Sequence, residues 1–324
     1  MKNDFIRPAS IKRSQFMLLL LLLCLAVPAI GSETSMIAPL ANRSLLLDAQ
    51  RIEDALITVG ERGHILISTD NGGNWQQANV PTRATLTGVY FIDRLNGWAV
   101  GHDQVILRSQ DGGNNWQLVH ENAEAESPLL DVYFSTAEHG YAIGAYGLFL
   151  ETFDAGNSWE QRFISEDDFH LNQLVPAGGR LFIAAEAGLA YRSDDGGESW
   201  IPLTPDYMGS FFGILPLEDN SLLLFGLRGN LFRSDDAGEN WQQLETATEA
   251  SLTSALRLAD GSLIIAGLAG ALLISKDDGQ SFRLQQDPER KGFSSLMQAA
   301  NGDIIAVGDF GVSKLPQINT NLDK

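Results

Sequence analysis

Ser109-Gln-Asp-Gly-Gly-Asn-Asn-Trp116 is the stretch that decides the fold of this chain. It is one of six copies of the pattern Ser/Thr-x-Asp-x-Gly-x-x-Trp/Phe, which begin at Ser68, Ser109, Thr152, Ser193, Ser234 and Ser275. The intervals between copies are 41, 43, 41, 41 and 41 residues, and each copy ends in an aromatic residue: Trp75, Trp116, Trp159, Trp200, Trp241 and Phe282. So regular a period means that one supersecondary unit is repeated along the chain.

A second repeated element lies upstream of each copy of this pattern, which we call the Asp box. It consists of a short apolar strand, a turn of the type Gly-x-x-Gly, and another strand. Seven such turns occur, at 60–63, 101–104, 144–147, 185–188, 226–229, 267–270 and 308–311. The seventh turn is not followed by an Asp box, so the chain holds seven repeats and the last one is incomplete.

Each repeat predicts four short antiparallel strands. In the second repeat the apolar runs and the turn-rich segments between them predict strands over 86–91, 97–100, 105–109 and 116–119. Asn-Gly and Asp-Gly pairs, as at Asn96-Gly97 and Asp260-Gly261, are typical of tight hairpins. Four-stranded units repeated around an axis form a β-propeller. We therefore expect an all-β fold, a seven-bladed β-propeller that occupies residues 32–324 as a single domain.

The seventh repeat lacks its outermost strand, because the chain ends soon after Ser313-Lys314-Leu315. Shifting the fourth strand of the first repeat back by one period falls on residues just after position 33. We predict that Met36 to Leu40 pairs with the last repeat as its missing strand. Such pairing would remove an open sheet edge and close the ring.

Residues 1–31 have the features of a secretory signal peptide. Lys2, Arg7, Lys12 and Arg13 form a basic start, and the apolar stretch 16–30 follows. Small residues at the end of that stretch suit a cleavage site. Fifteen apolar residues are short for a membrane span, which needs about 20. We expect an exported protein; an uncleaved membrane anchor remains an alternative.

Composition narrows the classes of partner. The chain has 22 Lys and Arg against 41 Asp and Glu, a formal net charge of −19, so DNA or RNA would be repelled unless a basic patch existed. No basic run follows the signal segment. Cys24 is the only cysteine, which excludes disulfides and thiolate metal sites from residues 32–324. We expect no nucleic-acid partner, no metal and no cofactor.

The Asp boxes are interpreted as structural. Their Asp and Ser/Thr side chains suit hydrogen bonds within the turn, glycine suits a positive φ, and the aromatic residue suits packing between blades. The Gly-x-x-Gly turns belong to the opposite face, and their inner residues vary between repeats, as expected of a binding surface on a repeat scaffold. The candidate partner-binding residues are Glu61, Arg62, His102, Asp103, Tyr146, Glu186, Arg228, Asp309 and Phe310.

Two further features concern this face and the axis. The middle linkers between repeats form an acidic lobe, made of Glu121, Glu124, Glu126, Glu166, Asp167 and Asp168. This lobe is either simply solvated or directed at a basic partner. The innermost strands carry small or polar residues at one register, which suggests a narrow, wet channel: Gly88, Asp131, Asn172, Gly213, Ser254 and Ser295.

Asp boxes also occur in sialidases, so a glycan-active or glycan-binding protein is the alternative. A sialidase needs three arginines for the substrate carboxylate, a tyrosine nucleophile with a glutamate partner, and an acidic acid/base residue. Arg62 and Arg228 could lie on the right face, but the sequence offers no clear third arginine. Tyr146 and Tyr207 lack an evident glutamate partner, so we assign no catalytic residues and no small-molecule substrate.

The chain resembles the photosystem II stability/assembly factor family. The stretches Arg108–Trp116, Arg192–Trp200, Gly88–Asp93 and Asn96–Gly101 carry the resemblance. It implies a non-enzymatic factor in the periplasm, or in the thylakoid lumen of a photosynthetic cell. Such a factor binds a membrane-protein client during assembly or stabilisation of a membrane complex. Photosynthetic members of that family are associated with an arginine-rich patch, which this acidic sequence does not show. Bacterial relatives without photosystems exist, so the client can belong to another membrane complex.

Overall fold

Short apolar runs that end at Gly, Asn or Asp become the strands of the fold. The computed structural model describes residues 34–316, so the predicted signal peptide lies outside the described residues. In the second repeat, β5 (Leu86–Phe91), β6 (Gly97–Gly101), β7 (Ile106–Ser109) and β8 (Gln117–His120) begin and end within one residue of the predicted ranges. These strands pair in sequence order as one antiparallel sheet, which forms blade two.

The other blades have the same strand order. Blade one holds β1 (Leu46–Ile52), β2 (Ala55–Gly60), β3 (Ile65–Ser68) and β4 (Gln76–Gln77). Blade three holds β9 (Leu129–Phe134), β10 (Gly140–Gly144), β11 (Phe149–Thr152) and β12 (Glu160–Arg162). Blade four holds β13 (Leu171–Ala177), β14 (Arg180–Ala185), β15 (Ala190–Ser193) and β16 (Ile201–Leu203).

The second half of the chain continues the series. Blade five holds β17 (Phe211–Pro216), β18 (Leu222–Gly226), β19 (Leu231–Ser234) and β20 (Gln242–Gln243). Blade six holds β21 (Leu252–Arg257), β22 (Leu263–Gly267), β23 (Ala271–Ser275) and β24 (Arg283–Gln286). Blade seven holds only β25 (Phe293–Gln298), β26 (Ile304–Gly308) and β27 (Gly311–Lys314).

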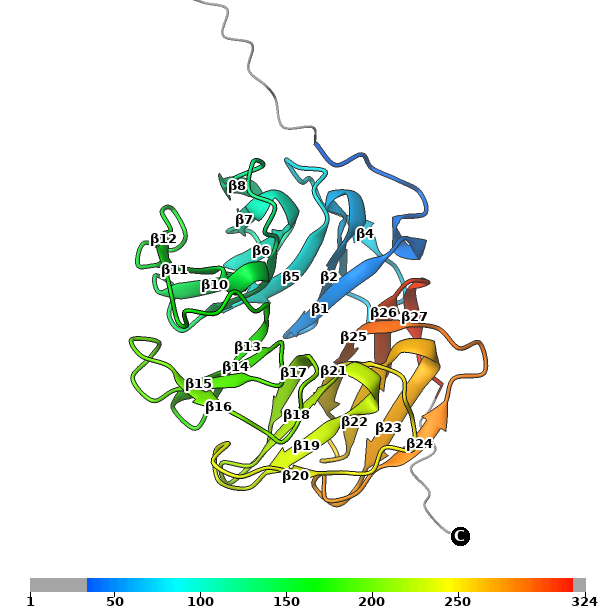
Figure 1. Ribbon diagram of the computed structural model, residues 1–324. Helices are drawn as coiled ribbons and strands as arrows, with labels where there is room; N and C mark the ends of the chain where they lie inside the picture. The colour runs from blue at the N-terminus through cyan, green and yellow to red at the C-terminus, as the bar shows by residue number, and fades with distance from the viewer. Residues whose placement is uncertain (1–33, 317–324) are drawn as a thin grey trace, which may run out of the picture. The chain divides into compact units, whose positions relative to one another are not determined.

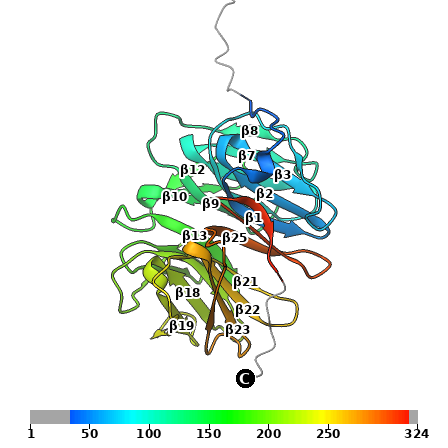
Figure 2. The ribbon, with the colours of Figure 1, turned by 90° about the vertical axis from the view of Figure 1, so that its right-hand side faces the viewer.

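The first strands of the seven blades lie next to one another around the axis (Figure 1). The ring closes because β1 lies beside β25, and both views show these two strands side by side (Figures 1 and 2). The prediction of an all-β, seven-bladed propeller is therefore confirmed. Within residues 34–316 no helix is both long and apolar enough to cross a membrane.

The core lies between neighbouring blades, where apolar faces of adjacent sheets meet. The cluster between blades one and two, for example, joins Ile57 and Ile65 to Phe91 and Trp116. The final aromatic residue of each Asp box packs in such an interface, as predicted: Trp75, Trp116, Trp159, Trp200, Trp241 and Phe282. Among the described residues, the cluster between blades six and seven holds no Asp-box aromatic.

The turns of the Asp boxes satisfy their own polar groups. In all six, the Ser or Thr hydroxyl accepts the glycine N–H at 2.8–3.0 Å. One oxygen of the Asp carboxylate accepts the N–H four residues later, again at 2.8–3.0 Å. These bonds give each side chain a local structural role, because they replace water at groups that the turn would otherwise leave unpaired.

The predicted closure by Met36–Leu40 as a fourth strand of blade seven is wrong, because the described residues of that blade pair as three strands. The segment bonds to blade one instead: the Ser35 N–H donates to Val80 O, and the Ala38 N–H donates to the Gln77 side chain. Pro39 has no N–H to offer a sheet ladder. The short 3-10 helix η1 (Ala41–Arg43) then packs at the junction of blades seven and one.

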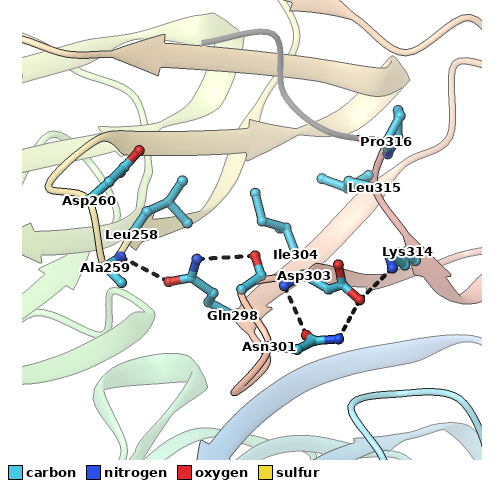
Figure 3. Close-up of a pocket in the computed structure, with 11 residues that line it drawn as sticks. Leu258, Ala259, Asp260, Gln298, Asn301, Asp303, Ile304, Lys314, Leu315 and Pro316 are labelled. Carbon is cyan, nitrogen blue, oxygen red and sulfur yellow. Dashed lines mark hydrogen bonds and ion pairs between the residues drawn. The ribbon is translucent and has the colours of Figure 1, made fainter.

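Among the described residues, a pocket of about 780 Å³ lies between blades six and seven (Figure 3). One repeat after Ser275, the position that would begin a seventh Asp box holds Pro316, which lines this pocket with Leu258 and Ile304. Polar side chains at its rim are bonded to one another or to backbone: Gln298 accepts the Ala259 N–H at 2.9 Å, and Lys314 pairs with Asp303.

Candidate partner-binding face

Each Gly-x-x-Gly turn joins the second and third strands of its blade, whereas each Asp box joins the third and fourth. In an antiparallel sheet these connections lie at opposite ends. The turns and the linkers between blades therefore share one face, which we call the turn face. All seven turns are held in the same way: the N–H of the first inner residue donates at 2.8–3.4 Å to the carbonyl of the residue immediately before the innermost strand of its blade.

The second inner residue of six turns adopts the left-handed backbone region. These residues have φ between 53° and 57° and are Arg62, Asp103, Tyr146, Ala187, Arg228 and Ala269. Five of the six turns form short 3-10 helices named η2 to η6: Glu61–Gly63, His102–Gln104, Ala145–Gly147, Leu227–Gly229 and Leu268–Gly270. The left-handed region costs a non-glycine residue about 1 kcal/mol, and such residues gather at binding sites.

Three predicted acidic residues support the scaffold. Glu61 accepts the Leu45 N–H at 3.3 Å, Glu186 accepts the His170 N–H at 3.1 Å, and Asp309 accepts the Gly292 N–H at 3.3 Å. Each acceptor thus holds the linker that leads into its own blade. Phe310 is half-buried and packs edge-on against Phe293, at 5.8 Å between ring centroids. These four residues therefore hold the linkers and turns of this face in place.

The remaining predicted residues project outward. Arg62, His102, Asp103, Tyr146 and Arg228 are exposed on the turns of blades one, two, three and five. The structure brings two predicted residues together through a third residue that the sequence did not single out. The His170 ring lies 4.9 Å from the Tyr146 ring, and its Nδ1 lies 2.6 Å from the Glu186 carboxylate. The other predicted residues are distributed around the ring, one turn to a blade.

Two exposed apolar residues of this face were missed by the sequence analysis. Phe163, just after β12, is 80% exposed, and Met208, in the linker between blades four and five, is 86% exposed. The Met208 backbone lies beside the turn that ends at Gly188. A signal was present, because both are large apolar residues in segments that the repeat pattern assigns to linkers.

The axis is lined by bulges, because every innermost strand carries one near its start. A pocket of about 140 Å³ there contains Asp48, Asp131, Asn172 and Gln173. The predicted match of Asn172 to Gly88 is wrong by one residue. Gln173 has the register of Gly88, and Asn172 is the extra residue of the bulge.

Two carboxyl groups in this channel have raised pKa values. Burial raises the pKa of Asp48, although its carboxylate accepts the Val89 N–H at 2.9 Å. Burial, together with the charge of Asp48, raises the pKa of Asp131 to about 7. Asp131 accepts the Leu174 N–H at 2.8 Å, so both groups tie their innermost strand to that of the next blade.

The arrangement does not favour the sialidase alternative. An arginine clamp would require guanidinium groups that converge at the channel, yet no arginine is among the described residues that line its pocket. Arg62 and Arg228 lie on the turns of blades one and five, away from each other around the ring.

Sequence comparison decides the family. The model of the family described as "Photosynthesis system II assembly factor YCF48" matches residues 67–127 and 115–265. The chain belongs to this family. A curated relative, the photosystem II assembly protein Ycf48 of Synechococcus sp. strain JA-3-3Ab, is 34% identical over 197 residues, which cover 59% of this chain and 54% of that protein. Thus the chain spans about half the length of this YCF48-family relative.

Solved structures agree with the fold. "YCF48 bound to D1 peptide" has a TM-score of 0.68 at 20% identity, and the match covers 86% of this chain and 94% of that one. A streptogramin B lyase structure has a TM-score of 0.74 at 13% identity, covering 88% and 96% of the two chains. At these identities the likeness concerns the fold alone, and the same fold serves a YCF48 and an enzyme.

Proposed function

We propose that this member of the YCF48 family is a non-enzymatic scaffold that binds a membrane-protein client through its turn face. The client would be bound during assembly or stabilisation of a membrane complex, after export of the chain to the periplasm or the thylakoid lumen. The observation that carries the proposal is the contrast within the turns: one hydrogen bond holds all seven, six share a left-handed residue, and the pair of inner residues differs in every blade.

The chemistry of the face suits a protein partner. Tyr146 is 59% exposed, and Phe163 and Met208 on the linkers of the same face are more exposed still. Exposed aromatic and Met side chains gather in protein interfaces, where they lose water on contact. The membership of the family supports a role in assembly, and the YCF48 structure with a D1 peptide supports a polypeptide as the ligand.

Site-specific photo-crosslinking in the native organism tests the proposal. A photoreactive phenylalanine analogue replaces Tyr146 on the turn face, and in a matched strain it replaces Asn114, an exposed residue of an Asp box. We expect a defined membrane protein to be crosslinked from position 146 and not from position 114. Equal crosslinking from both positions, or a client found only at position 114, would show that the turn face is not the binding face.

A further inference from the structure

The turn face is divided by charge. The acidic lobe, made of Glu121, Glu124, Glu126, Glu166, Asp167 and Asp168, occupies the linkers on both sides of blade three, and all six carboxylates are exposed. The turns of blades two, three and four and these two linkers contain no Lys or Arg. The nearest arginines on other turns are Arg62 on blade one and Arg228 on blade five. Arg162, the last residue of β12 in blade three, is paired with Glu151 at 2.6 Å.

Hydrogen bonds join this region into one surface. The Asn122 N–H donates to Asp103 O at 2.8 Å, which holds the first linker against the turn of blade two. The Ala145 N–H donates to Pro128 O at 2.9 Å, so the end of the same linker is fixed to the turn of blade three. The Gly147 N–H then donates to Phe169 O at 2.9 Å, which fixes the second linker to that turn. The carboxylates are thus held on adjoining segments.

Apolar side chains stand among these charges. Tyr146 projects from the turn between the two linkers, and Phe163 begins the second linker. Like charges held close together repel one another and attract counterions or a cationic ligand. Aromatic rings beside carboxylates bind Arg and Lys side chains well, because the ring face attracts the cation while the carboxylate pairs with it.

We propose that the acidic lobe, Tyr146 and Phe163 form a docking surface for a basic segment of the client that also carries apolar side chains. This inference rests on the proposed function and adds to it the chemistry of the contacting segment. Charge complementarity carries it: seven carboxylates, counting Asp103 on the turn of blade two, are exposed there, and the same segments contain no Lys or Arg. The region can therefore neutralise several Lys or Arg side chains at once.

Binding of a defined peptide tests whether the acidic lobe selects a basic ligand. The probe is a fluorescein-labelled 12-residue peptide of alternating Lys and Leu with a central Phe, and its counterpart has Glu in place of Lys. We expect fluorescence anisotropy to show binding of the basic peptide only, weakened at high salt. The variant E121Q/E124Q/E166Q/D168N should bind the basic peptide at least about tenfold more weakly. Each exposed ion pair between a carboxylate and a peptide Lys contributes modestly, and this variant removes four carboxylates together.

A charge-matched variant separates the lobe from the field of the whole protein. D54N/D206N/E245Q/E249Q removes four exposed carboxylates elsewhere and should change the affinity less than about threefold. Equal losses in the two variants, or no binding of the basic peptide by the natural chain, would overturn the proposal. The variant Y146S/F163S should weaken binding mainly at high salt, where the charges are screened and the apolar contact remains.

The two proposals can fail separately. If position 146 crosslinks a client and the four lobe substitutions leave that crosslink unchanged, the client binds the turn face but not by its basic segment. If the lobe binds the basic peptide and position 146 crosslinks no membrane protein in cells, the acidic lobe has a different ligand and the proposed function is wrong.

Discussion

The two faces of this propeller use their side chains in opposite ways. On the Asp-box face, Ser109 and Asp111 accept hydrogen bonds from N–H groups of their own turn, and the other five boxes repeat this arrangement. On the turn face, backbone groups hold the turn, as when the His102 N–H donates to Thr85 O, and the outward side chains differ from blade to blade. Repeated side chains therefore mark the scaffold, and varied ones on a repeated backbone mark the surface that is available for a partner.

The largest expected effect concerns the aromatic residues that end the Asp boxes. Trp116 is 5% exposed, packs edge-on against Phe91, and donates its indole N–H to Gly113 O at 2.8 Å. Trp116→Ala should lower the free energy of unfolding by about 3–5 kcal/mol, because it opens a cavity between blades one and two. Urea unfolding measures this loss. Trp116→Phe is the matched control, since blade six uses Phe282 at this position, and a loss as large as that of Ala would contradict the packing role.

A pair of neighbouring residues within one turn comes next. Gly229 has a φ of 72°, and a Cβ there would lie 2.1 Å from Thr248 O. Gly229→Ala should therefore cost about 2–3 kcal/mol of unfolding free energy. Arg228 has a φ of 57° and is exposed, so Arg228→Gly relieves the left-handed strain and should change stability by less than about 1 kcal/mol. If the two substitutions lowered the unfolding free energy by similar amounts, the backbone conformation of the turn would not be what holds the turn in place.

The channel predicts a dependence of stability on pH. The pKa of Asp131 rises from 3.8 to about 7 because of burial and the Asp48 charge. A raised pKa means that the folded state favours the protonated acid, so this contribution is complete below about pH 3.8 and is lost as the pH rises through 7. We expect the loss to be about 2–4 kcal/mol between pH 4 and pH 8. Urea unfolding over this range should show a clear decline for the natural chain and a smaller one for Asp131→Asn.

The Asp boxes predict the opposite sign. The hydroxyl and the backbone N–H of Ser199, with the hydroxyl of Ser193, lower the pKa of Asp195 to about 2. A lowered pKa means that this carboxylate contributes stability above about pH 3.8 and loses it as the pH falls through 2. Asp195→Asn should reduce the acid sensitivity of unfolding below pH 4 and leave the slope between pH 4 and pH 8 unchanged. If Asp195→Asn changed the pH dependence of the unfolding free energy between pH 4 and pH 8, that dependence would not come from Asp131 in the channel alone.

The sequence predicted what repeats and missed what occurs once. The period of 41 residues predicted the blades, because each apolar run and each glycine turn recurs in register. The strand expected over 36–40 did not form, since the Gln77 side chain and Val80 bind that segment to blade one. The register at Asn172 was wrong because Gln173, which has the register of Gly88, follows Asp131 by 42 residues rather than 41. The exposure of Phe163 depends on how a linker leaves its sheet, which no periodic pattern records.

The smallest expected effect on stability belongs to Tyr146, and it separates the two faces most clearly. Its ring is 59% exposed and contacts the His170 ring, so Tyr146→Ser should lower the melting temperature by only about 1–2 °C. The same change should sharply reduce the recovery of a client from solubilised membranes, because an exposed aromatic side chain contributes to a contact rather than to the fold. Thermal unfolding and affinity recovery of the two proteins measure both quantities. A large loss of stability with unchanged recovery would place Tyr146 in the scaffold, together with the Asp boxes, because side chains of the scaffold hold the fold without touching a partner.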